Sequence, residues 1–186
     1  PTLDEFRITA EGRVCRRWTA GWHYPDLGGM RALAEYTYYP DAGLLRLRST
    51  VHNPQAAVHS GGIWDLGDPG SVMFERFGLT VEGAVSARGS LRVNPGSDWL
   101  GPADDVSLYQ ASSGGELWQS AAHVDRNGDV RLPFRGYRVT VDRERLAPGD
   151  RHRASPTLRL ADREGLTVAS PRFWQNFPKR IGMSSS

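Results

Sequence analysis

The sequence predicts an all-β protein, an antiparallel β-sandwich with little helix. Short segments in which apolar and polar residues alternate recur along the whole chain, and Gly, Pro, Asn or Asp bound nearly every one of them. Such residues favour turns, and strict alternation favours half-buried strands. No helical pattern separates these segments, which argues against alternating strands and helices.

The predicted strands follow in order from the N-terminus. Residues 7–23 are typical of two strands around a turn at 10–12, and residues 30–53 of a hairpin about the Pro-Asp-Ala-Gly turn at 40–43. The one helix-compatible run, residues 28–39, contains so many β-forming residues that a strand is expected there. Alternation also predicts strands at residues 45–51, 72–83, 89–96, 136–146 and 156–173.

Length and charge limit the possible functions. A chain of 186 residues can bury roughly 70% of its unfolded surface, so we expect one domain covering residues 1–186. The abrupt ends, PTLDEF and KRIGMSSS, suggest a piece of a longer polypeptide. With 23 basic and 21 acidic residues interspersed, the net charge is +2, and no basic stripe for nucleic acid is present. No apolar segment is long enough to predict a membrane span.

Cys15 is the single cysteine, so the chain forms no internal disulfide. It lies in a segment that predicts a strand, with no histidine close in sequence. We expect a small packed residue rather than a nucleophile.

Three loops contain candidate functional residues, and the first spans residues 59–71. Paired glycines and an Asp-Pro-Gly turn hold its shape, and they could direct His59, Trp64, Asp65 and Asp68 at one point. Imidazole and carboxylate groups there could transfer protons or bind a cation or sugar hydroxyls. The alternative is that the aspartates cap turns and the tryptophan packs on a sheet.

The second loop, within residues 109–137, repeats this composition. Its candidates are Glu116, Trp118, His123 and Arg126. His123 has no nearby metal-ligand motif, which argues against a zinc site. A structural role for His123 stays open.

Calcium stays an open cofactor. Residues 125–129, Asp-Arg-Asn-Gly-Asp, lack the order and the closing glutamate of a helix–calcium–helix loop. A hairpin turn with Asn127 and Gly128 at its corner is the better interpretation.

The third candidate segment is residues 172–180. It could form an aromatic platform edged by amides that holds a sugar ring, or a hydrophobic seam against another domain. Its residues are Phe173, Trp174, Gln175, Asn176 and Phe177.

Four segments in this order resemble the central β-sandwich domain of the exo-rhamnogalacturonan lyases, a family of pectin-degrading polysaccharide lyases. The similarity spans residues 12–179, and WDLGDPGS and FWQNFPK are its most distinctive parts. The segments are HNPQAAVHSGGIWDLGDPGSV, SSGGELWQSAAHVDRNGDVRLPFRGYRV, SPTLRL and SPRFWQNFPK.

The resemblance implies a secreted protein that acts on pectic polysaccharide or oligosaccharide. Enzymes of this family cleave the rhamnose–galacturonate linkage by β-elimination, and they place a small β-barrel domain before the sandwich and an (α/α) toroid after it. Neither flanking domain is in this sequence, so the isolated domain is expected to be inactive and to contribute loops to the cleft of the whole enzyme.

The chemistry of β-elimination suggests a role for each candidate. The uronate carboxylate must be neutralised, a base must take the C5 proton, and an acid must protonate the leaving oxygen. By residue type, His59 or His123 could be base or acid, Arg126 could bind the carboxylate, and Trp64 could stack on a sugar. We expect the glycine turns to bring these groups to one rim of the sandwich.

Two alternatives from other classes remain. Six tryptophans and the loop aromatics also fit a non-catalytic carbohydrate-binding module. The loops could instead be structural and hold a neighbouring domain in place.

Overall fold

The strands of the chain all pair antiparallel in its structure, a computed structural model, and turns and loops connect them. The structure describes residues 1–62, 68–72, 75, 77–80, 88–116, 118, 127–129, 132–146, 153–161, 166–175 and 177–184. Three 3-10 turns of three residues each are the helical segments among them. The predicted all-β class is confirmed.

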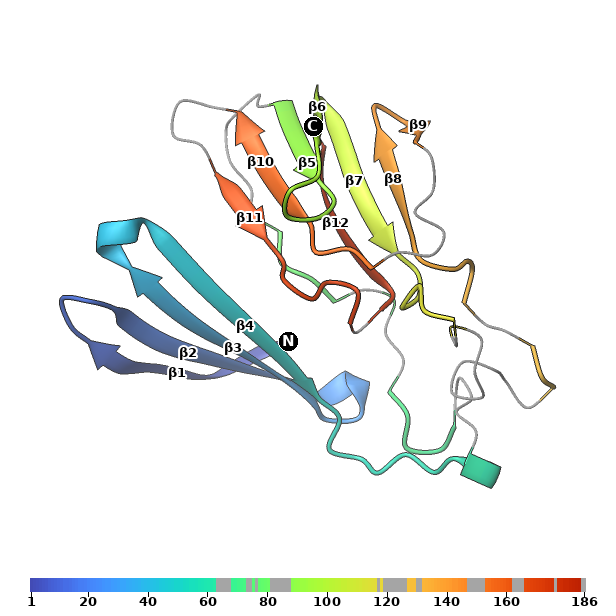
Figure 1. Cartoon of the computed structure of the whole chain (residues 1–186). Helices are drawn as coiled ribbons and strands as arrows, with labels where there is room; N and C mark the ends of the chain where they lie inside the picture. The colour runs from blue at the N-terminus through green and yellow to red at the C-terminus, as the bar shows by residue number, and fades with distance from the viewer. Residues whose placement is uncertain are drawn as a thin grey trace. The chain divides into compact units, whose positions relative to one another are not determined.

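Two compact units make up the chain, Pro1–Leu79 and Thr80–Ser186 (Figure 1). Each unit is described by itself below. The single domain predicted from the sequence stays a prediction, because two compact units can belong to one domain.

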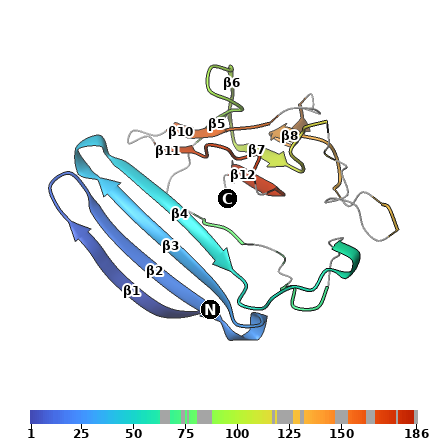
Figure 2. The same ribbon diagram turned by 60° about the horizontal axis from the view of Figure 1, so that its bottom comes forward.

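The first unit carries a four-stranded sheet in the order β1-β2-β3-β4, so each strand pairs with the next along the chain (Figure 2). Such an arrangement needs only short hairpin turns between neighbours. The strands are β1 (Thr2–Glu11), β2 (Arg16–Tyr24), β3 (Met30–Tyr39) and β4 (Leu44–His52).

The hairpin predicted at Pro-Asp-Ala-Gly is confirmed. Pro40–Ala42 form a 3-10 turn between β3 and β4, and Gly43 follows with a φ of 57°. The Gly43 N–H donates to the Pro40 carbonyl at 3.1 Å. Glycine adopts this left-handed conformation without the steric penalty of a Cβ, so the local sequence determines the turn.

The first hairpin turns later than predicted, and Cys15 lies in its turn rather than mid-strand. The Gly12 N–H donates to the Cys15 carbonyl at 3.1 Å, and the cysteine is half-buried. The cause is the pairing of Glu11 with Arg16, which extends the ladder past the predicted turn.

The register of the first sheet separates an apolar from a polar face. Directly paired residues share a face, so Trp18 and Tyr36 stack with their ring centroids 5.3 Å apart, beside the buried Ala34. Glu35 and Arg48 lie on the opposite face, where their charged groups are 3.7 Å apart. The alternation predicted for these strands is confirmed.

The second unit is a sandwich of two four-stranded sheets, with orders β11-β10-β5-β6 and β12-β7-β8-β9; Figure 2 shows them as two layers. Its core lies between the sheets: Leu91 and Leu158 come from the first, and Val106, Leu108 and Val139 from the second. The strands are β5 (Arg88–Arg92), β6 (Trp99–Ala103), β7 (Asp105–Gln110), β8 (Tyr137–Val141), β9 (Glu144–Arg145), β10 (Thr157–Ala161), β11 (Thr167–Ala169) and β12 (Lys179–Ser184).

Three predicted strands need correction. Residues 156–173 contain two paired strands, β10 and β11, instead of one. Where the structure describes residues 72–83, at 72, 75 and 77–80, the backbone lies outside the strands, since alternation specifies a face but supplies no pairing partner. Residues 136–146 form a hairpin rather than one strand, because Asp142 and Arg143 have φ values of 44° and 69° and reverse the chain between β8 and β9.

Among the described residues, no helix has the length and apolar character needed to cross a bilayer.

Candidate functional site

His59 and Asp68, two of the side chains predicted from the loop at residues 59–71, contact each other in the first unit. His59 Nδ1 lies 2.9 Å from Asp68 Oδ2. The Asp68 side chain is 1% exposed, whereas that of His59 is 22% exposed, so the imidazole is the part that solvent reaches. Trp64 and Asp65 lie outside the described residues.

Hydrogen bonds to the backbone hold the two sides of this loop together. The Val58 N–H donates to the Pro69 carbonyl at 2.8 Å, and the Asn53 side-chain amide donates to the Gly70 carbonyl at 2.7 Å. These bonds lie immediately beside the two residues that contact each other. The His59–Asp68 contact therefore lies beside a hydrogen-bonded junction between residues 53–58 and 69–70.

Tight turns flank the pair, as the glycines and the Asp-Pro-Gly sequence predict. The Gly62 N–H donates to the His59 carbonyl at 3.1 Å, and the Ser71 N–H donates to the Asp68 carbonyl at 2.9 Å. Gly61 has a φ of 70°, a left-handed conformation that favours glycine. Local sequence thus determines both bends.

A buried carboxylate beside an imidazole gives that ring a defined chemistry. With Asp68 ionised, His59 Nδ1–H donates to the carboxylate, and the neutral ring places its lone pair on Nε2. The carboxylate also stabilises the imidazolium that forms when the ring accepts a proton. The pair is suited to proton transfer, and the same contact also fits the turn-capping role considered for Asp68.

The second predicted loop belongs to the second unit. Glu116 is exposed and Trp118 is half-buried, and the Trp118 N–H donates to the Gly115 carbonyl at 3.3 Å. His123 and Arg126 lie outside the described residues. The roles suggested for these four side chains, and their convergence with His59, stay predictions.

A buried glutamine organises the start of this loop. Gln110 Nε2 donates to the Ser112 carbonyl at 2.6 Å, and its Oε1 accepts from the Ala154 N–H at 3.0 Å. The Ser112 hydroxyl accepts from the Gly136 N–H at 2.7 Å. Sequence reasoning missed Gln110; the available signal was a polar side chain at an inward position of an alternating strand.

The aromatic platform predicted within residues 172–180 is wrong for Phe173. This ring is 2% exposed and packs in the core of the sandwich, because the turn directs it inward. Trp174 is half-buried, with the Arg153 guanidinium 4.1 Å from its ring centroid, and Gln175 is exposed. Asn176 lies outside the described residues.

Arg153 joins the second and third predicted segments. Besides stacking on Trp174, its Nη2 lies 3.7 Å from the position that a Cβ would take at Gly115. The Trp174 N–H donates to the Ala154 carbonyl at 3.1 Å, beside the amide that Gln110 binds. Two segments far apart in sequence therefore meet at one end of the sandwich.

Lys179, near the end of the third predicted segment at residues 172–180, is expected to make stability depend on pH. Its ammonium lies 5.3 Å from the Phe173 ring centroid, and burial lowers its pKa below the ordinary 10.5. Between the lowered pKa and 10.5 the unfolded chain binds more protons than the folded chain, so the free energy of unfolding rises with pH in that window. Lys179→Met should remove this rise, measured by urea unfolding from neutral pH upward.

Tyr137 sets the highest pH at which the unfolding of the two proteins can be compared. Burial raises its pKa above the ordinary 10.0, so above that value the folded chain binds the extra proton and stability falls as pH rises. The comparison with Lys179→Met is therefore made below pH 10.0. Equal slopes for both proteins there would contradict the prediction.

A hollow that sequence reasoning missed lies on the outer face of the sheet β12-β7-β8-β9. Its volume is about 470 Å³. Its walls combine two guanidinium groups, two aromatic rings and three hydroxyls, one of them phenolic, and no carboxylate is among them. The lining residues are Ser107, Tyr109, Phe134, Arg138, Thr140 and Arg180.

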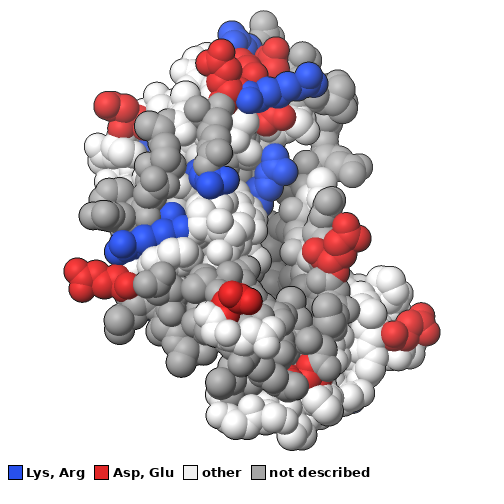
Figure 3. All heavy atoms as spheres, turned by 90° about the vertical axis from the view of Figure 1, so that its right-hand side faces the viewer, with Lys and Arg blue, Asp and Glu red and all other residues white. Residues whose placement is uncertain are grey.

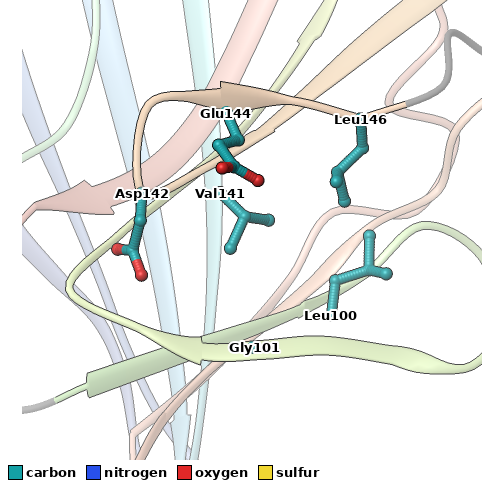
Figure 4. A pocket seen from close by; sticks show the side chains of 6 residues that line it. All are labelled: Leu100, Gly101, Val141, Asp142, Glu144 and Leu146. Atoms are coloured by element: carbon teal, nitrogen blue, oxygen red, sulfur yellow. The ribbon is translucent and has the colours of Figure 1, made fainter.

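A second hollow, of about 370 Å³, lies between β6 and the β8–β9 hairpin (Figure 4). Leu100 and Leu146 point toward one another there, and Asp142 and Glu144 supply carboxylates. The Asp142 carboxylate accepts from the N–H groups of the two residues that precede and begin β7, at 2.9 and 3.0 Å. It is therefore a structural cap, and these carboxylates would repel an anionic sugar.

Charge on the described surface is mixed. On the face that Figure 3 draws, described basic and acidic side chains lie side by side at the top of the view and are scattered elsewhere. Within the described residues, no three or more His, Cys, Asp or Glu side chains are grouped as a metal ion would require. The cation binding considered for the loop with Asp65 and Asp68 stays untested, since Asp65 lies outside that part of the chain.

Comparison of the chain with models of known protein families, with curated proteins and with solved structures finds no match in any of the three.

Proposed function

We propose that the chain is the β-sandwich domain of a polysaccharide lyase that cleaves rhamnogalacturonan by β-elimination and contributes loops to the sugar-binding cleft. Its substrate would be a pectic polysaccharide or oligosaccharide outside the cell. The proposal rests on the motif resemblance and on one structural observation, the buried Asp68 carboxylate that contacts His59.

The proposed step requires a base close to the uronate C5–H bond. That bond breaks as the base takes the proton, its electrons form the C4=C5 double bond, and the bond from C4 to the leaving oxygen breaks. The leaving oxygen then takes a proton from an acid. His59 is assigned as the base, with the Asp68 carboxylate holding the ring and stabilising the imidazolium that results.

The experiment measures turnover of rhamnogalacturonan oligosaccharides by the intact protein, meaning the whole enzyme of which the chain is proposed to be one domain. Turnover is monitored by the ultraviolet absorbance of the unsaturated galacturonate. His59→Ala should lower kcat about 100- to 10,000-fold, the usual contribution of a general base. Asp68→Asn should also lower kcat, because the amide carries no charge to stabilise the imidazolium.

His52→Ala is the matched control, because this histidine is exposed at the end of β4 in the same unit. It should leave turnover unchanged. The thermal midpoint of each variant shows that it is folded. Turnover that survives His59→Ala in a folded protein would refute the catalytic role of His59.

A further inference from the structure

The outer face of the sheet β12-β7-β8-β9 has the chemistry of a site for an acidic sugar. We propose that the hollow between Arg138 and Arg180 binds the carboxylate of a uronate residue, outside the His59–Asp68 pair. The inference rests on the proposed function only for the choice of uronate among carboxylate-bearing sugars.

Strand register brings the two arginines to one site. Tyr109 on the central strand β7 pairs with Arg138 on one side and Arg180 on the other, so the three residues form one row across the sheet. Neighbouring strands lie about 4.8 Å apart, which puts the two arginine Cα atoms about 10 Å apart. Side chains as long as arginine can reach one ligand across that distance.

The adjacent row consists of small residues, which leaves room above the sheet. Ser107 pairs with Gly182 on one side and Thr140 on the other. A Cβ on Gly182 would lie 2.7 Å from the Ser107 Cβ and 2.8 Å from the Val106 carbonyl oxygen, so this strand fits closely only without a side chain. The hollow thus lies over the small row and beside the arginine row.

The positive charge of this hollow is not neutralised by a described carboxylate. Arg138 stacks on Phe134, its guanidinium carbon 3.6 Å from the ring centroid, and its buried Nε has no acceptor among the described residues. Arg180 donates from Nη2 to the Ser107 hydroxyl at 3.2 Å, which orients its planar group. Two oriented guanidinium groups that pair with no described carboxylate are suited to hold the carboxylate of a ligand.

The remaining wall chemistry favours a sugar over a simple anion. Phe134 and Tyr109 meet edge to face, with centroids 5.8 Å apart, and provide apolar surface for the C–H groups of a pyranose ring. The hydroxyls of Ser107 and Thr140 can pair with sugar hydroxyls. The volume of about 470 Å³ lies within the range of ligand pockets.

The test is calorimetric titration of the chain with an oligogalacturonate and with its carboxyl-reduced, neutral counterpart. The acidic oligomer should bind, and the neutral one should bind at least tenfold more weakly. Arg180→Gln should weaken binding of the acid about 10- to 100-fold through loss of a charge-assisted contact. Arg138→Lys should also weaken it, since lysine keeps the charge but loses the planar fork.

Arg159→Gln is the matched control, an exposed strand arginine on the other sheet of the same unit, and it should bind normally. Inorganic sulfate and phosphate, titrated alone, test for a general anion site. Binding of these ions as tight as that of the acidic oligomer would overturn the sugar assignment, and so would equal binding of the neutral oligomer or no effect of Arg180→Gln.

His59→Ala separates this inference from the proposed lyase activity. That variant should bind the acidic oligomer with unchanged affinity, because the hollow contains no residue of the first unit. A chain that binds the oligomer while the intact protein forms no unsaturated product would refute the lyase proposal and leave this inference standing.

Discussion

Phe173→Ala is expected to lower the free energy of unfolding of the second unit by about 3–5 kcal/mol, the usual cost of deleting a buried phenylalanine ring. Phe173 is among the largest fully buried side chains described, and it packs against the cluster that joins the two sheets. Its loss would leave a cavity between close-packed layers that relax only partly.

Native-state hydrogen exchange at the amides of β7 measures this loss directly. Leu108, in that strand, is completely buried in the same core, so its amide reports opening of the sandwich itself. Trp174→Ala is the control, since the neighbouring ring is only half-buried and should cost much less. Equal losses in the two variants would contradict the assignment of Phe173 to the core.

Gly70→Ala is expected to disrupt the loop that holds His59 against Asp68. Gly70 has a φ of 80°, and an added Cβ would overlap the Ala56 carbonyl oxygen and lie 2.9 Å from its carbon. Both obstacles are backbone, so no side chain can move aside. We expect the free energy of unfolding to fall by about 1–3 kcal/mol because of the left-handed backbone conformation and by about 1–3 kcal/mol more because of the overlap.

Gly61→Ala separates the cost of a left-handed backbone conformation from the cost of steric overlap. It also has a left-handed φ, 70°, but an added Cβ meets nothing within 4 Å. The Gly61→Ala variant should therefore lose only the part of the stability that depends on the backbone conformation. The thermal midpoint gives stability, and the nitrogen chemical shifts of the His59 ring report its contact with Asp68. An unchanged His59 spectrum in Gly70→Ala would show that the loop tolerates the methyl group.

Short-range patterns predicted the features that depend on neighbouring residues. The Pro-Asp-Ala-Gly turn, the bends beside His59 and the alternation along β3 and β4 all follow from the allowed φ values of glycine and from the two-residue period of a strand. The contact of His59 with Asp68 was foreseen only as a possibility, since sequence shows that a loop bends but not which side chains meet.

Features that depend on pairing were missed or misplaced. Lys179–Ser184 gave no strand signal that distinguished them from a fragment end, yet they pair with β7. Phe173, between the exposed Arg172 and the half-buried Trp174, looked like part of a surface platform, but its ring packs in the core. In both cases the deciding partner is remote in sequence.

The sequence by itself determined the all-β class, the Pro-Asp-Ala-Gly hairpin turn and the presence of carboxylates and an imidazole in the first loop, because these follow from backbone sterics and side-chain chemistry within a few residues. Only the tertiary structure decided which aromatic ring is buried and which arginines share a surface. Arg138 and Arg180 flank Tyr109 because two strands pair with β7 in a particular register, and a shift of either strand by one residue would turn its arginine to the opposite face.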